Sequence, residues 1–159
     1  MKLTKDVCLN KPFYLIDSSI YIFRAYFAMP ERWQSPEGYS VDALYGYALF
    51  LFKFLDEVKP VKISAAFDES LGSCFRNEIF PGYKNSRAHP DEALAFQLSA
   101  CKSLTTFMGI QSLASVRYEA DDIIASHAAL ARQRGEEVCV VSRDKDLGQV
   151  LESAGDVLW

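Results

Sequence analysis

Histidine and cysteine are scarce in this sequence of 159 residues, and their scarcity excludes one class of metal site. There are two histidines, His89 and His127, and four cysteines that stand far apart and form no C-x-x-C pair. A zinc site of thiolates and imidazoles is therefore not expected. Because the cysteines lie on apolar segments, we expect reduced thiols in the core of a cytoplasmic protein.

Long hydrophobic runs and nucleotide-binding loops are also lacking. The longest apolar stretch, Tyr47 to Phe52, is far below the roughly 18 residues of a membrane-spanning helix. The charged start of the chain does not look like a signal peptide, so no membrane association is expected. The sequence contains neither G-x-G-x-x-G nor a P-loop. With 50% hydrophobic and 24% charged residues, the composition is that of one globular domain over residues 1–159.

Strands and helices are expected to alternate along the chain. Short apolar runs predict strands at 13–16, 61–67, 110–113, 138–141 and 157–159. Helical periodicity predicts helices at 20–29, 41–58, 90–108, 120–135 and a short one ending at 151. Pro90 is expected at the first position of its helix. Helix 41–58 is apolar on more than one face, so we expect it to be widely buried. The alternation predicts a mostly parallel, three-layer α/β sheet.

Acidic residues follow four successive expected strands. They are Asp17, Asp68, Glu119, Asp121, Asp122, Asp144 and Asp146. The carboxyl ends of parallel strands share one edge of a sheet, so these side chains should converge. When these seven are set aside, the chain has 14 other acidic residues of its 21 and 17 basic residues. The charged residues outside the group of seven are therefore mildly basic in sum. For this reason the net charge of −4 does not exclude binding to nucleic acid.

Each acid alone could be a helix cap. Together they would repel one another by about 1 kcal/mol per pair even in water, and protons or cations must relieve that repulsion. Oxygen ligands favour Mg²⁺ or Mn²⁺. Two such ions can activate water and hold a phosphodiester in line, which suits phosphoryl transfer.

A basic, aromatic segment spans residues 75–87. Arg76, Lys84 and Arg87 interleave with Phe75, Phe80 and Tyr83. Cations bind phosphates and aromatic rings stack on unpaired bases, although a solvated loop with tucked aromatics fits the composition equally well.

Six motifs occur in an order that resembles the 5′-nuclease, or flap-endonuclease, family, which includes the 5′-nuclease domain of bacterial DNA polymerases. They are Leu15-Ile16-Asp17 with Tyr21 and Arg24, Ala66-Phe67-Asp68, Phe75-Arg76, Gly82-Tyr83-Lys84 with Arg87, Tyr118-Glu119-Ala120-Asp121-Asp122, and Ser142-Arg143-Asp144-Lys145-Asp146-Leu147. The resemblance covers nearly the whole chain.

The resemblance implies a PIN-like, Rossmann-like fold with a helical arch over 81–108, and Mg²⁺-dependent DNA hydrolysis near 5′ ends, flaps and junctions. By residue, it implies a first metal ion at Asp17, Asp68, Glu119, Asp121, Asp122 and Asp144, and a second at Asp144 and Asp146. It implies catalytic contacts from Lys84 and Arg87, phosphate contacts from Arg24 and Arg76, and base stacking on Tyr83. A monomer acting on DNA with a free 5′ end or flap is expected.

One departure separates this sequence from the family. Family members continue into a helix-hairpin-helix region that grips duplex DNA and carries two further aspartates for the second ion; this chain ends at Trp159, inside an expected strand. We therefore expect the natural protein to be longer. Three other interpretations stay open: a nucleic-acid-binding module without full catalysis, a PIN-type ribonuclease, and a phosphohydrolase of small substrates.

Overall fold

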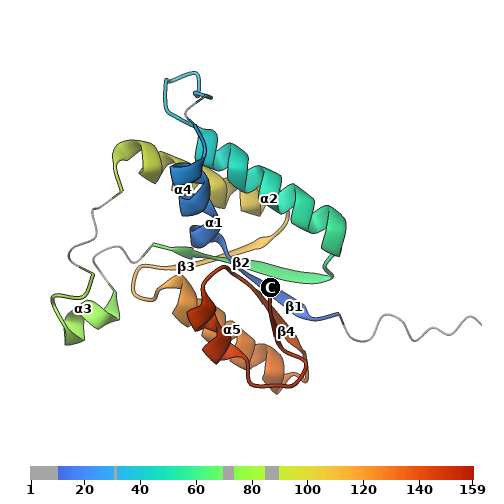
Figure 1. Cartoon of the computed structure of the whole chain (residues 1–159). Helices are drawn as coiled ribbons and strands as arrows, with labels where there is room; N and C mark the ends of the chain where they lie inside the picture. Colours follow the sequence, from blue (N-terminus) through green and yellow to red (C-terminus); the bar gives the residue numbers. More distant parts are fainter. Residues whose placement is uncertain (1–10, 31, 70–73, 85–89) are drawn as a thin grey trace, which may run out of the picture.

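A sheet of five parallel strands forms the centre of the computed structural model, which describes residues 11–30, 32–69, 74–84 and 90–159 (Figure 1). The strands are β1 (Phe13–Asp17), β2 (Lys62–Asp68), β3 (Gln111–Ser115), β4 (Val138–Val141) and β5 (Val157–Leu158). Their order is β3-β2-β1-β4-β5, and every neighbouring pair is parallel. The predicted parallel α/β sheet is confirmed.

The strand order reverses at β1. From this central strand the chain builds outward through β2 to β3, and then crosses to the other side for β4 and β5. Open parallel sheets bind their ligands beyond the carboxyl ends of the strands at such a reversal. The crevice between the ends of β1 and β4 is therefore the first place to look for a site.

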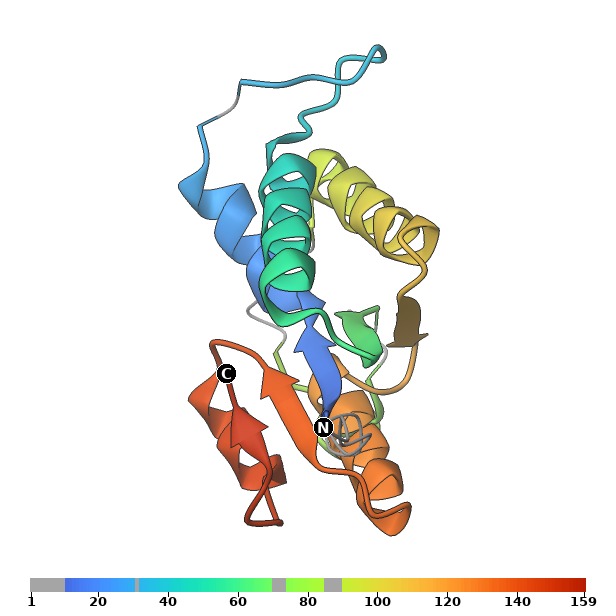
Figure 2. The same cartoon turned by 90° about the vertical axis from the view of Figure 1, so that its right-hand side faces the viewer.

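Helices cover both faces of the sheet and produce three layers. One face carries α1 (Ser18–Ala28), α2 (Asp42–Val58) and α4 (Glu92–Phe107), and the other carries α5 (Ala120–Gln133) and the 3₁₀ helix η1 (Lys145–Val150) (Figures 1 and 2). Each face has its own buried apolar cluster. The three-layer prediction is confirmed.

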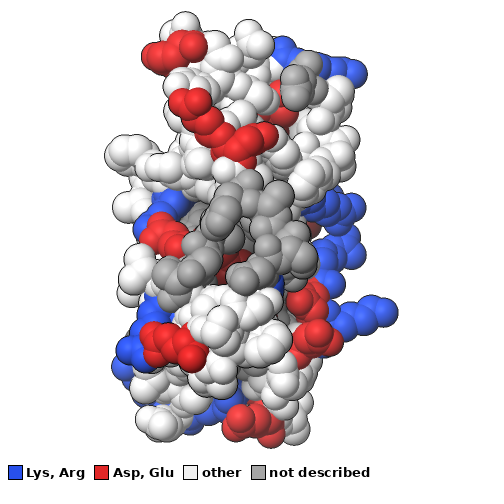
Figure 3. Space-filling view, turned by 90° about the vertical axis from the view of Figure 1, so that its left-hand side faces the viewer, with Lys and Arg blue, Asp and Glu red and all other residues white. Residues whose placement is uncertain are grey.

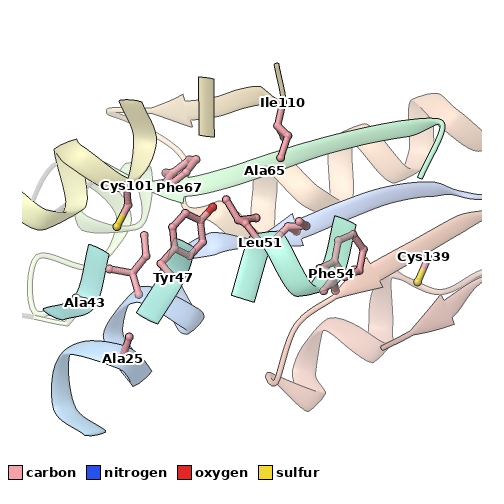
Figure 4. Close-up of a cluster of buried hydrophobic side chains, with 13 residues drawn as sticks. Ala25, Ala43, Tyr47, Leu51, Phe54, Ala65, Phe67, Cys101, Ile110 and Cys139 are labelled. Carbon is pink, nitrogen blue, oxygen red and sulfur yellow. The ribbon is translucent and has the colours of Figure 1, made fainter. Parts of the chain in front are cut away.

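Tyr47 joins the three helices of the first layer. It lies fully buried on α2, among the side chains drawn in Figure 4. Its hydroxyl hydrogen-bonds to Ser18 Oγ of α1 (2.9 Å) and Thr105 Oγ1 of α4 (3.0 Å), and burial raises its pKa to about 12. Because Ser18 directly follows the end of β1, this contact fixes the chain where the acidic edge begins.

Helix α2 begins one residue later than predicted, with Val41 as its N-cap, and it lacks the predicted wide burial. Tyr45, Leu49 and Phe52 are exposed by 45%, 50% and 58%, whereas Leu51 and Phe54 are buried. The expectation was wrong because the helix packs only through the stripe that faces the sheet, α1 and α4.

Helix α4 begins later than the sequence suggests. Asp91, not the residue before Pro90, is the N-cap, and its Oδ1 accepts a hydrogen bond from the Leu94 amide (2.8 Å). Pro90 therefore precedes the cap and is not the first helical residue, because the aspartate side chain satisfies a free amide better than proline can. Cys101 and Thr105 are buried in α4, so most of the predicted arch segment is a core helix.

The structure also bears on smaller predictions. A short helix, α3 (Phe75–Ile79), lies in the basic segment where no helix was expected. Cys74, Cys101 and Cys139 are buried free thiols, as predicted; Cys8 lies outside the described residues. His127 is partly buried, and desolvation lowers its pKa. Within the described part of the chain, none of the helices has the length and apolar character required to cross a membrane.

Candidate functional site

The ends of β1 and β4 are joined by a buried carboxylate. Asp17 is the last residue of β1 and is 5% exposed. Its Oδ2 accepts a hydrogen bond from Ser142 Oγ (2.8 Å), and Ser142 directly follows β4. Asp17 therefore lies inside the crevice where the strand order reverses.

Asp68 fastens the start of α5 to the end of β2. Its Oδ1 accepts a hydrogen bond from the Ala120 amide (2.7 Å), and its own amide donates to Ser19 Oγ (2.8 Å). The first residues of α1 and α5 are thereby held beside the two central strands. This arrangement brings Glu119, Asp121 and Asp122, which lie at the start of α5, to the same edge.

Glu119 and Asp122 form the capping box of α5. Each side chain accepts a hydrogen bond from the other's backbone amide, which satisfies two amides at the helix start. Arg76 of α3 donates to both oxygens of Asp122, at 2.6 and 2.7 Å. Those hydrogen bonds, above all other causes, hold the pKa of Asp122 below its ordinary value. In this structure Asp122 is therefore the partner of Arg76.

Glu119 also receives two side chains from the basic segment. Lys84 Nζ donates to Glu119 Oε1 (2.6 Å), and the Tyr83 hydroxyl donates to Oε2 (3.1 Å). Arg76 Nη1 lies 3.3 Å from Oε2. The Lys84 ammonium also lies over the Tyr83 ring, 5.1 Å from its centroid. Tyr83 and Lys84 thus both contact Glu119 at the start of α5.

Asp144 and Asp146 lie after β4, at the start of η1. Asp144 caps this helix, since its Oδ1 accepts a hydrogen bond from the Asp146 amide (2.9 Å). The Asp144 amide donates to Ser142 Oγ (3.0 Å), which connects it to Asp17. Asp146 is exposed in the first turn of η1.

The carboxylates at this edge act on one another. Burial raises the pKa of Asp17 to about 6, with a hydrogen bond from Ser142 opposing and the charges of Asp68 and Asp121 adding to the rise. The pKa of Asp121 is also raised, first by desolvation and then by Asp68, Asp144 and Glu119. Carboxylates from separate elements therefore lie close enough to influence one another's protonation. Figure 3 shows one side of the molecule, on which Lys and Arg side chains lie interspersed with Asp and Glu side chains.

The donor set fits a hard divalent cation. Its groups are carboxylates, the ligands preferred by Mg²⁺ and Mn²⁺, and their mutual repulsion favours a bound cation. Within the described ranges, however, no three His, Cys, Asp or Glu side chains are arranged so that they could already hold an ion. An ion would therefore require side chains to move, and Glu119 would have to leave its cationic partners.

The remaining predicted residues fall in two places. Arg24 is exposed on α1 and lines a groove of about 770 Å³. Arg143 and Lys145 line the same groove, which reaches Ser142 at the acidic edge. Arg87 lies outside the described residues.

The sequence analysis missed two serines that position the acids. Ser19 and Ser142 bind the end of β2 and the Asp17 carboxylate. A signal was present, because each serine stands within two residues of a strand-end aspartate. Serines in such places also cap helices, so their position in the sequence does not distinguish the two roles.

Comparison with known proteins identifies similar sequences and folds. The model of the family described as 5′-3′ exonuclease, N-terminal resolvase-like domain matches residues 12–158. DNA polymerase I of Streptococcus pneumoniae (strain ATCC BAA-255 / R6) is 37% identical over 146 residues, which cover 90% of this chain and 16% of that protein. DNA polymerase I of Mycobacterium leprae is 35% identical over 161 residues, covering 99% and 18%.

Solved structures show the same fold at lower identity. The T5 D15 protein co-crystallised with metal ions superposes with a TM-score of 0.69 at 16% identity, over 92% of this chain and 54% of that one. A T5 D15 flap endonuclease variant in complex with DNA and metal ions gives 0.64 at 18% identity, over 92% and 53%. The chain thus spans about a sixth of the polymerases and about half of the T5 protein.

Proposed function

Because this chain belongs to the family of 5′-3′ exonuclease N-terminal resolvase-like domains, we propose that it hydrolyses DNA phosphodiesters near free 5′ ends and 5′ flaps with the help of divalent metal ions. The observation that carries this proposal is the acidic edge. There, carboxylates come together from four elements: Asp17 ends β1, Asp68 ends β2, Asp121 lies in the first turn of α5 and Asp144 caps η1. The 5′-exonuclease description of the family and the DNA complex of the T5 relative support the choice of substrate.

The metal ions in this proposal are Mg²⁺ or Mn²⁺. Structures similar to this one were crystallised with metal ions, and the donor chemistry of the acidic edge agrees. We assign the first ion to Asp17, Asp68, Glu119, Asp121, Asp122 and Asp144, and a second ion to Asp144 and Asp146. When bound, such ions generate hydroxide from water and stabilise the negative charge that develops on the phosphate.

The protein's own groups bind and orient the DNA. Lys84 and Arg87 bind the phosphate at which cleavage occurs, where positive charge stabilises the transition state. Arg24 and Arg76 contact other phosphates, and Tyr83 stacks on a base. Ser142 holds Asp17 through its hydrogen bond (2.8 Å). The protein is proposed to act as a monomer in the cytoplasm, with residues 1–159 as one domain.

Cleavage of a 5′-flap DNA labelled at both ends tests this function. With Mg²⁺ the chain should release short 5′ products from the flap, and EDTA should abolish them. DNA that is bound but left intact in Mg²⁺ and in Mn²⁺ would contradict hydrolysis and favour a binding module. An RNA substrate of the same shape, cut faster than the DNA, would favour the ribonuclease interpretation.

A further inference from the structure

The environment of Glu119 does not fit the role of a metal ligand at rest. This predicted ligand is 9% exposed, and hydrogen bonds occupy both of its oxygens. Lys84 Nζ takes Oε1, and the Tyr83 hydroxyl and Arg76 Nη1 approach Oε2. A cation that binds Glu119 must therefore replace a cation that is already there.

The three donors differ in how firmly they are held. Arg76 is anchored elsewhere by its two hydrogen bonds to Asp122, and such paired contacts of a planar guanidinium fix it in place. Lys84 is a single ammonium on a flexible stem, a third of it exposed. Lys84 is thus the donor that can leave without breaking the start of α5.

The backbone at Lys84 has an unusual conformation, and the side chain reaches Glu119 from it. Lys84 has a φ of +52°, a left-handed conformation that a lysine adopts at a cost. The turn is held in place by Asn77, whose Nδ2 donates to the Tyr83 carbonyl (2.8 Å), and by the Tyr83 amide, which donates to the Phe80 carbonyl (2.9 Å). An unfavourable backbone held by specific contacts indicates that the position of this ammonium matters.

The charge of Lys84 also reaches beyond Glu119. It acts on Asp121 and Asp122 as well, so one ammonium offsets part of the repulsion at the acidic edge. A bound divalent ion would offset the same repulsion between carboxylates. Lysine ammonium groups also bind phosphate, so a phosphodiester can compete with the carboxylate for Lys84.

We propose that Lys84 is an internal counter-ion of Glu119, and that metal and DNA replace this ion pair by exchanging partners. The divalent ion takes the Glu119 carboxylate, and the released ammonium takes a phosphate of the DNA. The exchange couples metal binding to substrate binding at one residue pair. It rests on the proposed nuclease function, which assigns both residues to the site.

Lysine footprinting tests the exchange without measuring cleavage. Brief acetylation of the chain, read by mass spectrometry, reports how accessible each ammonium is. Mg²⁺ alone should raise the acetylation rate of Lys84 about threefold, the size expected from loss of one partly exposed ion pair, and DNA added with Mg²⁺ should lower it again. Lys102 is the matched control, since it pairs with Glu69 (2.5 Å) and is equally exposed; its rate should stay constant.

A neutral substitution gives a second readout. Tyr83→Phe removes a hydrogen bond from Glu119 without changing charge, so calorimetry should show Mg²⁺ affinity raised about threefold, the effect of one hydrogen bond. Tyr45→Phe, on the exposed side of α2, should leave that affinity unchanged.

Two results would overturn the exchange. In one, Mg²⁺ binds by calorimetry while the acetylation rate of Lys84 stays constant. In the other, Mg²⁺ fails to bind both the original chain and Lys84→Ala. If flap cleavage persists in the first case, the exchange is wrong and the nuclease function stands. If footprinting shows the exchange but no cleavage occurs, the nuclease function is wrong.

Discussion

At the scale of single residues, Asp17 shows that the candidate site opposes stability. Burial raises its pKa from 3.8 to about 6, so the folded state binds a proton that the unfolded state has already lost. The stability that this proton contributes is complete below pH 3.8 and is lost as the pH rises to about 6. At neutral pH the ionised carboxylate costs about 3 kcal/mol, at 1.36 kcal/mol per unit.

Asp17→Asn should therefore stabilise the chain in EDTA. We expect a gain of about 1–3 kcal/mol in the free energy of unfolding at pH 7.5, because a neutral side chain replaces a buried charge. The gain should vanish at pH 4, where Asp17 is already protonated. Urea unfolding at both pH values measures it, with Asp56→Asn on the exposed side of α2 as the control. An equal effect at both pH values would contradict the role of burial.

Lys84→Ala should slow flap cleavage far more than it weakens DNA binding. We expect cleavage to fall about 100- to 1,000-fold, the usual loss when a group that stabilises transition-state charge is removed. Binding should weaken much less, because the other bases remain. Single-turnover cleavage and fluorescence anisotropy measure the two quantities. If Lys84→Ala lowered the cleavage rate and the DNA affinity by the same factor, Lys84 would only help to dock the DNA. The same conclusion would follow if the control Lys102→Ala lost as much cleavage.

The acids were predictable residue by residue, and most of their partners were not. Each predicted acid follows a strand or starts a helix, and those local patterns are visible in the sequence. The pairing of Arg76 with Asp122 joins residues 46 positions apart. That contact depends on where β2, β3 and α5 place α3, so local sequence cannot show it.

At the scale of elements, the start of α5 is the place where the elements that carry the site residues contact one another. Asp68 of β2 binds the Ala120 amide, and Arg76 of α3 binds Asp122. Two elements, β2 and α3, thus contact the first turn of α5. Positioning by rigid elements is what keeps a catalytic constellation in place.

Arg76→Gln should weaken the contact between α3 and the start of α5. We expect a loss of about 1–2 kcal/mol in the free energy of unfolding, since a partly exposed, charge-assisted pair is removed. Asp122→Asn should cost a similar amount, and the double variant should cost little more than either, because both remove the same interaction. Urea unfolding of all four proteins measures this cycle. Additive losses would show that Arg76 and Asp122 act separately.

Strands and long helices were predictable because their periodicity is local. Gly109 and Gly135, which follow the expected helices or end them, adopt left-handed φ values of +79° and +72° just beyond α4 and α5. Helix α3 has five residues, too few for a recognisable period. The exposed side of α2 escaped prediction since apolar content alone does not reveal which side meets the sheet.

At the scale of the whole molecule, an ion at the acidic edge would bind together strands that lie far apart in sequence. We expect Mg²⁺ to stabilise the chain by about 2.7 kcal/mol when its concentration is 100 times the dissociation constant. EDTA should reverse the effect, and Asp121→Ala should remove most of it. Thermal unfolding with and without Mg²⁺ measures it. Equal stabilisation of the Asp121→Ala variant would locate the ion elsewhere.

The parallel sheet, its three layers and the acidic edge could all be predicted from sequence, because alternating elements force strand ends together. The resting arrangement of that edge could not. The pairing of Arg76 with Asp122 depends on where the folded chain places α3, and the pairing of Lys84 with Glu119 depends on the turn at 81–84.

The central claim is that the acidic edge performs metal-dependent DNA hydrolysis, and one measurement tests it most directly. Cleavage of a 5′-flap DNA in Mg²⁺ is compared for the original chain, Asp121→Ala and Asp56→Ala, with DNA binding measured in parallel. We predict that Asp121→Ala binds DNA and does not cut it, whereas Asp56→Ala cuts at the original rate. Undiminished cleavage by Asp121→Ala would contradict the account.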